Sequence, residues 1–303
     1  MNLSSKKAFG GNIALLLAAF IWGTSFVAQS VGMESVEAFT FNGIRMFLGC
    51  AALLPLIVFM QIRKRKNDTR TEAEKKKQAA VQFKSGVICG VILYCASSFQ
   101  QFAFNYSTPG KIGFITALYM LLVPVFGLAL KQRPGLFVWF AVLMGCVGAY
   151  LLCVDAEMTI GKGELLTLAC AVFYAIHILY IDSVVDKVDG VLLSFTQFFV
   201  VGVISAVCML IFETPQAENI QAAMVPMLYS GIMSSGIAYT LQIIGQKHTQ
   251  PAVASLLMCL ESVFAVLSGW VILHEALTGR EILGCVIMFV AIILTNLPER
   301  KKT

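Results

Sequence analysis

The chain has 303 residues, of which 58% are hydrophobic and only 13% are charged, and its formal net charge is +5. This composition excludes an ordinary soluble domain and a disordered chain, because both need far more polar and charged residues. It favours a protein built largely from membrane-spanning segments, which bury long apolar runs in lipid.

Ten apolar stretches follow one another along the chain. Each is long enough for a helix that crosses a bilayer, which takes about 20 mostly apolar residues. Lipid offers no partners to backbone N–H and C=O groups, so runs of this length predict helices. The sequence therefore predicts an all-α membrane protein with ten transmembrane helices. The expected spans are residues 11–31, 36–60, 84–106, 111–130, 135–153, 163–184, 190–213, 223–246, 251–273 and 280–297.

The basic residues gather in alternate gaps between these spans. Eighteen of the 22 lysines and arginines fall in one set of tails and loops, whereas the other set holds only Lys111, Lys162 and Arg280. Because cytoplasmic loops collect positive charge, we expect an even number of spans with both termini in the cytoplasm. The longest basic stretch, residues 61–84, is expected to be a solvated linker. Orientation explains the net charge, and nucleic acid is not an expected partner.

Sequence motifs for metal binding and catalysis are missing. The nine cysteines are scattered through the spans, no CxxC pair occurs, and the three histidines lie far from any cysteine at zinc-ligand spacing. No metal and no other cofactor is therefore expected. The aspartates lie in or near loops, and neither HExxH nor GxxxxGK[ST] occurs, so an enzyme or an ATP-driven pump is not expected.

The two halves of the chain, residues 11–153 and 163–297, resemble each other in order. GNIALLLAAFIWGTSF in the first half aligns with GELLTLACAVFYAIHI in the second, so that Trp22 matches Tyr174. The third span of each half carries a polar stripe, and LVPVF corresponds to LESVF. Five crossings are an odd number, so the second copy would be inserted upside down. Inverted repeats are typical of secondary transporters, whose binding site lies near the midplane between the halves.

These features resemble the EamA-type permeases of the drug/metabolite transporter superfamily. The resemblance rests on FIWGTSF, on Arg45, on FITALYMLLVP and on GWVILHEALTGREILG, and it covers about residues 11–297. It implies ten helices in two five-helix repeats around a central cavity. It also implies a secondary transporter, most often an exporter, of amino acids or other small metabolites. We expect a plasma-membrane location, with the lipid bilayer and a small-molecule substrate as partners. The sequence leaves open whether the chain forms a homodimer.

Glu261 is the first functional candidate, because a carboxylate in the middle of an apolar span is costly at bilayer depth. It would bind a proton or another cation in the cavity, receive a substrate ammonium group, or remain a neutral acid that only packs. His177 is the second candidate, since histidine can titrate near neutral pH. Its alternative role is a plain hydrogen bond between helices.

We expect the polar stripes of the third and eighth spans and several aromatic side chains to line the cavity. Amide groups at Gln101 and Gln242 offer both donors and acceptors, which suits a polar or zwitterionic metabolite. The alternative is that these groups only join helices. The predicted substrate-binding residues are Trp22, Ser25, Gln101, Tyr119, Tyr174, His177, Tyr239, Gln242 and Glu261, with Glu261 and His177 as candidates for proton coupling.

Two further residues carry expectations of their own. The side chain of Arg45 is expected to reach the membrane interface, with pairing to Glu37 or a place at the cavity as alternatives. Pro124 is expected to kink the fourth span, because proline removes a backbone hydrogen bond.

A passive facilitator and a lipid-carrier flippase subunit are the competing functions. A passive pore for neutral solutes has little need of Glu261. A flippase would be expected to hold a lipid head group with a separate charged clamp, for which Arg45 is the only hint.

Overall fold

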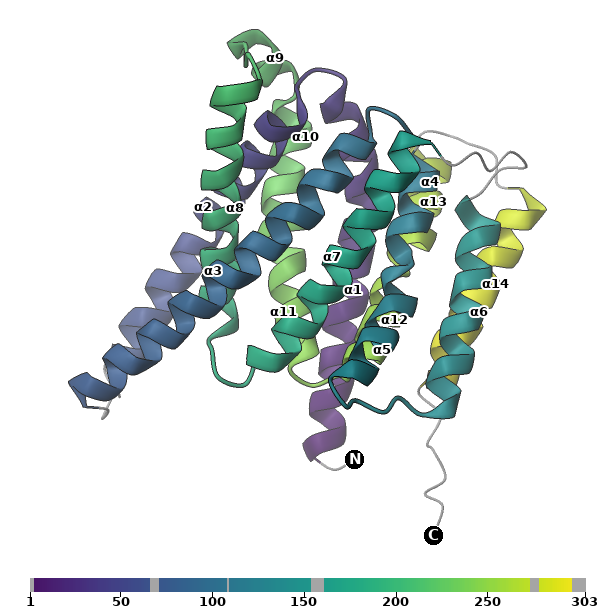
Figure 1. Cartoon of the computed structure of the whole chain (residues 1–303), viewed down its shortest axis with the longest axis horizontal. Coiled ribbons are helices and arrows are strands. Elements are labelled where there is room, and N and C mark those ends of the chain that lie inside the picture. Colours follow the sequence, from purple (N-terminus) through teal and green to yellow (C-terminus); the bar gives the residue numbers. More distant parts are fainter. Residues whose placement is uncertain (1–2, 66–70, 108, 154–160, 273–277, 296–303) are drawn as a thin grey trace.

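The computed structural model describes residues 3–65, 71–107, 109–153, 161–272 and 278–295, and every regular element in these ranges is a helix. The helices follow one another along the chain as shown in Figure 1. They are α1 (Leu3–Met33), α2 (Ala38–Arg65), α3 (Glu72–Ala103), α4 (Pro109–Ala117), α5 (Tyr119–Ala129), α6 (Leu136–Cys153), α7 (Lys162–Val184), α8 (Gly190–Phe212), α9 (Ala217–Ala222), α10 (Met224–Tyr229), η1 (Ser230–Tyr239), α11 (Thr240–Gln246), α12 (Pro251–Met258), α13 (Glu261–Ile272) and α14 (Gly279–Thr295).

The second half of the chain runs in the opposite direction to the first. In Figure 1, α1 begins at the lower end of the bundle, where α14 ends, whereas α7 begins at the upper end. The halves also interleave: α2 packs on α8 and η1, α3 packs on α7 and α8, and α6 packs on α14. Each half thus completes the other, and the protein is an all-helical membrane protein of two-repeat architecture.

Seven helical segments in the described part of the chain are long and apolar enough to cross a membrane. They correspond to seven of the ten expected spans. The other three correspond to α6, to α10, η1 and α11 taken together, and to α14, all of which run along the bundle in Figure 1. For these three, crossing the membrane stays an expectation, and residues 273, 296 and 297 of the expected ninth and tenth spans lie outside the described residues.

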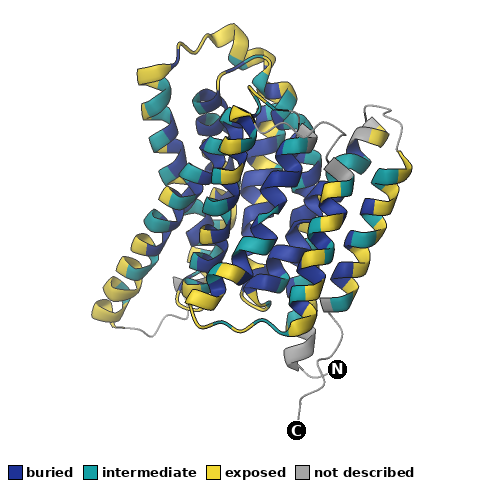
Figure 2. Ribbon diagram, turned by 45° about the vertical axis from the view of Figure 1, so that its right-hand side comes forward, coloured by how far each residue is buried: buried dark blue, intermediate teal, exposed yellow. Residues whose placement is uncertain are grey.

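Buried residues line the inner faces of the helices, and exposed residues cover the outside and the ends (Figure 2). Many of the exposed side chains are large and apolar, among them Phe59, Leu210 and Val225. In water such an apolar surface would promote aggregation, whereas in a membrane it contacts the apolar lipid chains.

The basic stretch between the second and third spans is more helical than expected. The helix α2 continues to Arg65, and α3 already begins at Glu72. A capping box explains this early start: Thr71 Oγ1 accepts from the Glu74 backbone N–H, and the Glu74 carboxylate accepts from the Thr71 N–H. With 32 residues, α3 is about 48 Å long and therefore extends beyond a hydrocarbon core of about 30 Å.

The fourth and the ninth spans each contain one irregular turn. Leu118 separates α4 from α5, and Cys259 and Leu260 separate α12 from α13. The backbone torsions of Leu118 and Cys259 remain in the right-handed helical region, and each span is long and apolar enough to cross a membrane as one segment, as the sequence predicts. Pro124 lies inside α5, six residues after the irregular turn of the fourth span.

The two halves are also joined at the upper end of the bundle. Glu213, which follows α8, is 8% exposed and accepts three hydrogen bonds from the first turn of α2. The backbone N–H of Phe39, the backbone N–H of Thr40 and the Thr40 hydroxyl each donate to its carboxylate at 2.7 Å. The side chain thus caps α2 from the neighbouring half, where unpaired N–H groups favour a negative charge.

Candidate functional site: a pocket between the two repeats

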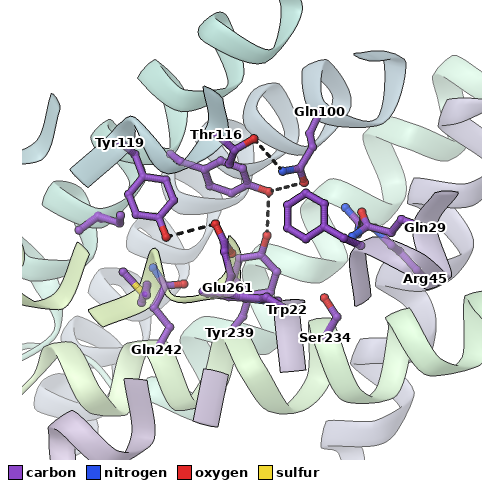
Figure 3. A pocket seen from close by; sticks show the side chains of 14 residues that line it. Trp22, Gln29, Arg45, Gln100, Thr116, Tyr119, Ser234, Tyr239, Gln242 and Glu261 are labelled. Atoms are coloured by element: carbon purple, nitrogen blue, oxygen red, sulfur yellow. Dashed lines mark hydrogen bonds between the residues drawn. The ribbon is translucent and has the colours of Figure 1, made fainter. Parts of the chain in front are cut away.

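The central pocket lies where the fourth and the ninth spans meet (Figure 3). Its cavity volume is about 40 Å³, so in this structure it has space for water-sized molecules and is nearly closed to a larger ligand. Ten helical elements contribute to it. Its lining residues are Trp22, Phe26, Gln29, Arg45, Gln100, Thr116, Tyr119, Tyr174, Ile178, Ser234, Tyr239, Gln242, Met258 and Glu261.

Glu261 is the first residue of α13, directly after the irregular turn in the ninth span. Its side chain is 5% exposed, and Tyr119 Oη donates to its Oε1 at 3.2 Å. Gly23 of α1 lets this segment come close, because a Cβ at that position would lie 2.7 Å from the Glu261 backbone oxygen.

A chain of hydrogen bonds crosses the pocket from the second half to the first. Tyr239 Oη lies 3.0 Å from Tyr174 Oη, and Tyr174 Oη donates to Gln100 Oε1 at 3.2 Å. Gln100 Nε2 in turn donates to Thr116 Oγ1 at 3.3 Å. Since the Tyr174 proton is used on Gln100, Tyr239 is the donor of the first bond. Four polar side chains of the pocket wall are thereby fixed in place.

Aromatic rings form much of the pocket wall. Trp22 packs edge-on against Tyr239 with ring centroids 4.9 Å apart, and Tyr119 packs against Tyr174 at 6.5 Å. Within the described residues, Trp22 Nε1 has no acceptor although it is buried. Such a wall offers an apolar surface together with unpaired polar tips to a bound molecule.

Six of the nine predicted substrate-binding residues come together in this pocket. These are Trp22, Tyr119, Tyr174, Tyr239, Gln242 and Glu261. They derive from both halves of the chain, as the expected repeat requires. Whether they bind substrate stays a prediction.

The other three predicted residues, Ser25, Gln101 and His177, do not line the pocket. His177 is fully buried behind Tyr239, with its Nε2 at 3.0 Å from Gln197 Oε1. Ser25 lies 3.5 Å from the Ser230 hydroxyl on the neighbouring half. All three side chains face neighbouring helices, so helix packing takes the place of the expected contact with the cavity.

The position next to Gln101 lines the pocket in its place. Gln100 makes the bonds to Tyr174 and Thr116 described above, whereas both amide atoms of Gln101 are buried without a partner among the described residues. The side of α3 that faces the pocket is therefore one residue, or about 100°, away from the side that the polar stripe predicted.

Arg45 follows the alternative that places it at the cavity. Its side chain is 2% exposed and lines the pocket, so it neither reaches the interface nor pairs with Glu37. Two polar residues that accept hydrogen bonds from it are Gln29 of α1 and Asn42 of α2. An arginine inside an apolar span was the available signal in the sequence.

Further cavities lie toward the two ends of the bundle. One is lined by the turns around Arg133 and His248 and by Gln246, and another by residues near Glu34, Asn105 and Glu213. Gln246 Nε2 donates at 3.0 Å to the backbone oxygen of Ile178, which lines the central pocket. Gln246 thus lies between the central pocket and the cavity at the lower end.

Two inverted, interleaved halves around a central pocket are the architecture of many membrane transporters. The model of the EamA-like transporter family matches residues 9–154 and again residues 161–297. The chain belongs to the EamA-like transporter family.

Relatives along the whole length agree with this assignment. A protein of Archaeoglobus fulgidus named as an uncharacterized transporter is 27% identical over 292 residues, which cover 96% of this chain and 87% of the relative. The Bacillus subtilis protein YoaV, also named as an uncharacterized transporter, is 22% identical over 94% of this chain and 96% of its own. A solved crystal structure with 20% identity covers 94% of this chain and 96% of its own, with a TM-score of 0.74, and shares the fold.

Proposed function

We propose that this transporter is a secondary transporter of small polar metabolites such as amino acids, which it moves by alternating access and in the direction of export. It acts in the plasma membrane with both termini in the cytoplasm. Protons drive the transport through Glu261.

The polar pocket between the two halves is the observation that carries the proposal. Polar side chains inside a membrane protein are tolerated where they line a cavity, and secondary transporters bind their substrates in such a place between repeats. The lining combines aromatic rings with hydroxyl, amide and carboxyl groups, as a site for a small polar molecule requires.

The place of Glu261 supports proton coupling. Its carboxyl group is buried in the pocket, and its one side-chain partner in the described part of the chain is the Tyr119 hydroxyl. A buried carboxyl group without a cationic partner is more stable when protonated, so exposure to one side of the membrane and then the other would change its proton occupancy. A hydroxyl partner suits both forms, because it donates to the carboxylate and accepts from the acid.

The basic tails and loops support the orientation. Tags at the N- and C-terminus, probed with impermeant reagents in intact cells, are expected to be protected together. Labelling of one terminus alone would contradict an even number of spans.

Solute counterflow in proteoliposomes tests the transport proposal. The purified full-length chain is preloaded with each of the twenty protein amino acids, and with nucleosides as a second class, with and without a pH gradient. We expect accelerated exchange for a subset of amino acids and a stimulation of net flux by the gradient. Equal exchange and net flux for many unrelated solutes would support a passive facilitator instead.

Glu261→Gln separates coupling from binding. The amide keeps the size of the side chain but cannot release a proton, so we expect gradient-driven flux to fall to the level without a gradient while counterflow continues. Glu218→Gln is the matched control, because Glu218 is exposed on α9 and far from the pocket lining. Full gradient-driven flux in Glu261→Gln would remove the coupling proposal.

A further inference from the structure

Arg45 is a buried cation in the described core without an anionic partner. Its side chain is 2% exposed, and within the described residues no carboxylate forms an ion pair with it. Arginine remains charged at any physiological pH. A buried charge is expensive unless an opposite charge or a full set of hydrogen bonds compensates it. The missing compensation points to a partner that comes from outside the chain.

Two amide side chains hold the guanidinium group in place. Arg45 Nη1 donates to Gln29 Oε1 at 2.7 Å, and Arg45 Nε donates to Asn42 Oδ1 at 3.0 Å. Asn42 is itself fixed, because its Nδ2 donates to the hydroxyls of Ser97 at 3.0 Å and Ser205 at 3.3 Å. Helices from both halves thus preorganise the group.

The remaining nitrogen of Arg45 is free. Nη2 is buried and has no acceptor among the described residues, although the side chain lines the central pocket. Gln29 and Ser234 line the pocket on the same side, as Figure 3 shows. Because Nη2 has almost no accessible surface in this state, an anion entering the pocket would meet this charged N–H donor, with the Ser234 hydroxyl nearby, once the neighbouring side chains shift. Charge-assisted bonds from arginine to a carboxylate or phosphate are among the strongest hydrogen bonds in proteins.

Glu261 lies on the other side of the same pocket (Figure 3). The first half of the chain thus provides a permanent cation, and the second half provides a carboxyl group that can release a proton. A zwitterion with its anionic end at Arg45 would bring its ammonium end to Glu261, where it would take the place of the proton. A plain amine would leave Arg45 unpaired, and an anion with two charged ends would bring one of them to Glu261.

On the basis of the function proposed above, we infer that Arg45 is the residue that binds the carboxylate of the substrate and thereby selects zwitterions over the corresponding amides and amines. Sequence analysis gave the membrane interface as the first expectation for Arg45 and the cavity as an alternative. The inference gives it a direct contact with the transported molecule and makes it a determinant of specificity.

The test compares matched ligands in the counterflow assay and in a thermal unfolding assay of the detergent-purified full-length chain. The probes are leucine, its amide, 3-methylbutylamine, 4-methylpentanoate and the phosphonate analogue of leucine, with phenylalanine and its amide as a second series. Wild type is expected to bind the amino acid at least about tenfold more tightly than its amide or the simple amine, because one charge-assisted hydrogen bond is lost in those ligands.

Arg45→Gln should remove this preference. We expect its affinity for the amino acid to fall by about 10- to 100-fold while its affinity for the amide changes little. Arg45→Lys keeps the charge without the planar group and should retain part of the preference. Lys247→Gln is the control for loss of a positive charge, since Lys247 lines the cavity at the lower end and not the central pocket.

The outcomes separate the two proposals. Counterflow of amines, amides or nucleosides in preference to carboxylates would keep the transporter function and overturn the role of Arg45. Tighter binding of the phosphonate than of the carboxylate would overturn the carboxylate as the anionic group. If no solute is exchanged, the proposed function fails, and thermal unfolding then tests Arg45 independently. Stabilisation of the wild type by amino acids that is lost in Arg45→Gln would support the inference. Equal stabilisation of the two proteins, or none in either, would overturn it.

Discussion

The third span of the first half and the third span of the second half hold equivalent places but differ in their backbone. The first is α3, a single α-helix of 32 residues with a capping box at its start. The second consists of three elements: the short α-helix α10, the ten-residue π-helix η1, and the short α-helix α11. A π-helix costs hydrogen-bond geometry and is frequent at functional sites. The difference is therefore concentrated where Tyr239, the last residue of η1, reaches the pocket.

The comparison shows how a polar stripe relates to a binding site. On α3, the residue that lines the pocket is Gln100, although the stripe pointed to Gln101. On the third span of the second half, two residues of the predicted stripe, Tyr239 and Gln242, do line the pocket. Tyr239 is the last residue of the π-helix η1, and Gln242 follows it in α11. Helical spacing finds the polar face of a helix to within about one residue, and packing against neighbouring helices decides which side chain reaches the cavity.

The largest expected effect concerns the close contact of η1 with α2. A Cβ at Gly231 would lie 2.5 Å from Leu48 Cβ and 2.8 Å from the Arg45 backbone oxygen. Gly231→Ala is expected to lower the free energy of unfolding by about 1–3 kcal/mol through overpacking. Thermal unfolding in detergent measures this. Gly113→Ala is the control, because a Cβ there meets nothing within 4 Å, and equal unfolding temperatures for the two variants would contradict the close contact.

A smaller effect is expected when the phenol of the π-helix is removed. Tyr239→Phe deletes the hydrogen bond to Tyr174, so substrate affinity should fall by about 2- to 10-fold, as the loss of about 0.5–1.5 kcal/mol implies. The matched change on α3 is Tyr94→Phe, whose hydroxyl lies 3.1 Å from Cys208 Sγ and outside the pocket lining. Counterflow at graded substrate concentrations compares them, and a larger loss in Tyr94→Phe would reverse the assignment.

The smallest effects separate the two neighbouring glutamines of α3. Gln100→Leu leaves the Tyr174 hydroxyl without its acceptor, so we expect counterflow to be reduced several-fold. Gln101→Leu replaces an amide that has no partner among the described residues, so we expect unchanged counterflow and an unfolding temperature equal to or above that of wild type. Lower counterflow in Gln101→Leu than in Gln100→Leu would restore the stripe as first predicted.

Much of the fold could be predicted from the sequence, because lipid requires long helices and apolar runs are easily seen. The two repeats and their inversion followed from the order of similar segments and an odd number of spans. The irregular turns at Leu118 and Cys259 could not be predicted, since both lie in apolar stretches without glycine or proline at the turn.

The candidate site was predicted in part, for a similar reason. Glu261, Tyr119 and Tyr174 are unusual enough in apolar helices to be noticed individually. The first expectation for Arg45, a place at the membrane interface, came from its position along the helix. That position carries no information about the amide groups of Gln29 and Asn42, which accept hydrogen bonds from it in the folded chain. Hydrogen bonds across distant segments, such as that from Asn42 to Ser205, appear only in the folded chain.

The capping of α2 by Glu213 has a consequence for how the two halves can move. Pulling α8 away from the start of α2 would strip a carboxylate of three donors at once, each worth about 1.5–3 kcal/mol for a charged acceptor. A rotation of the two halves relative to each other would cost less if this contact stayed intact and acted as the hinge. The halves would then separate first at the faces farthest from Glu213, and a disulfide engineered between the end of α8 and the start of α2 would leave turnover intact.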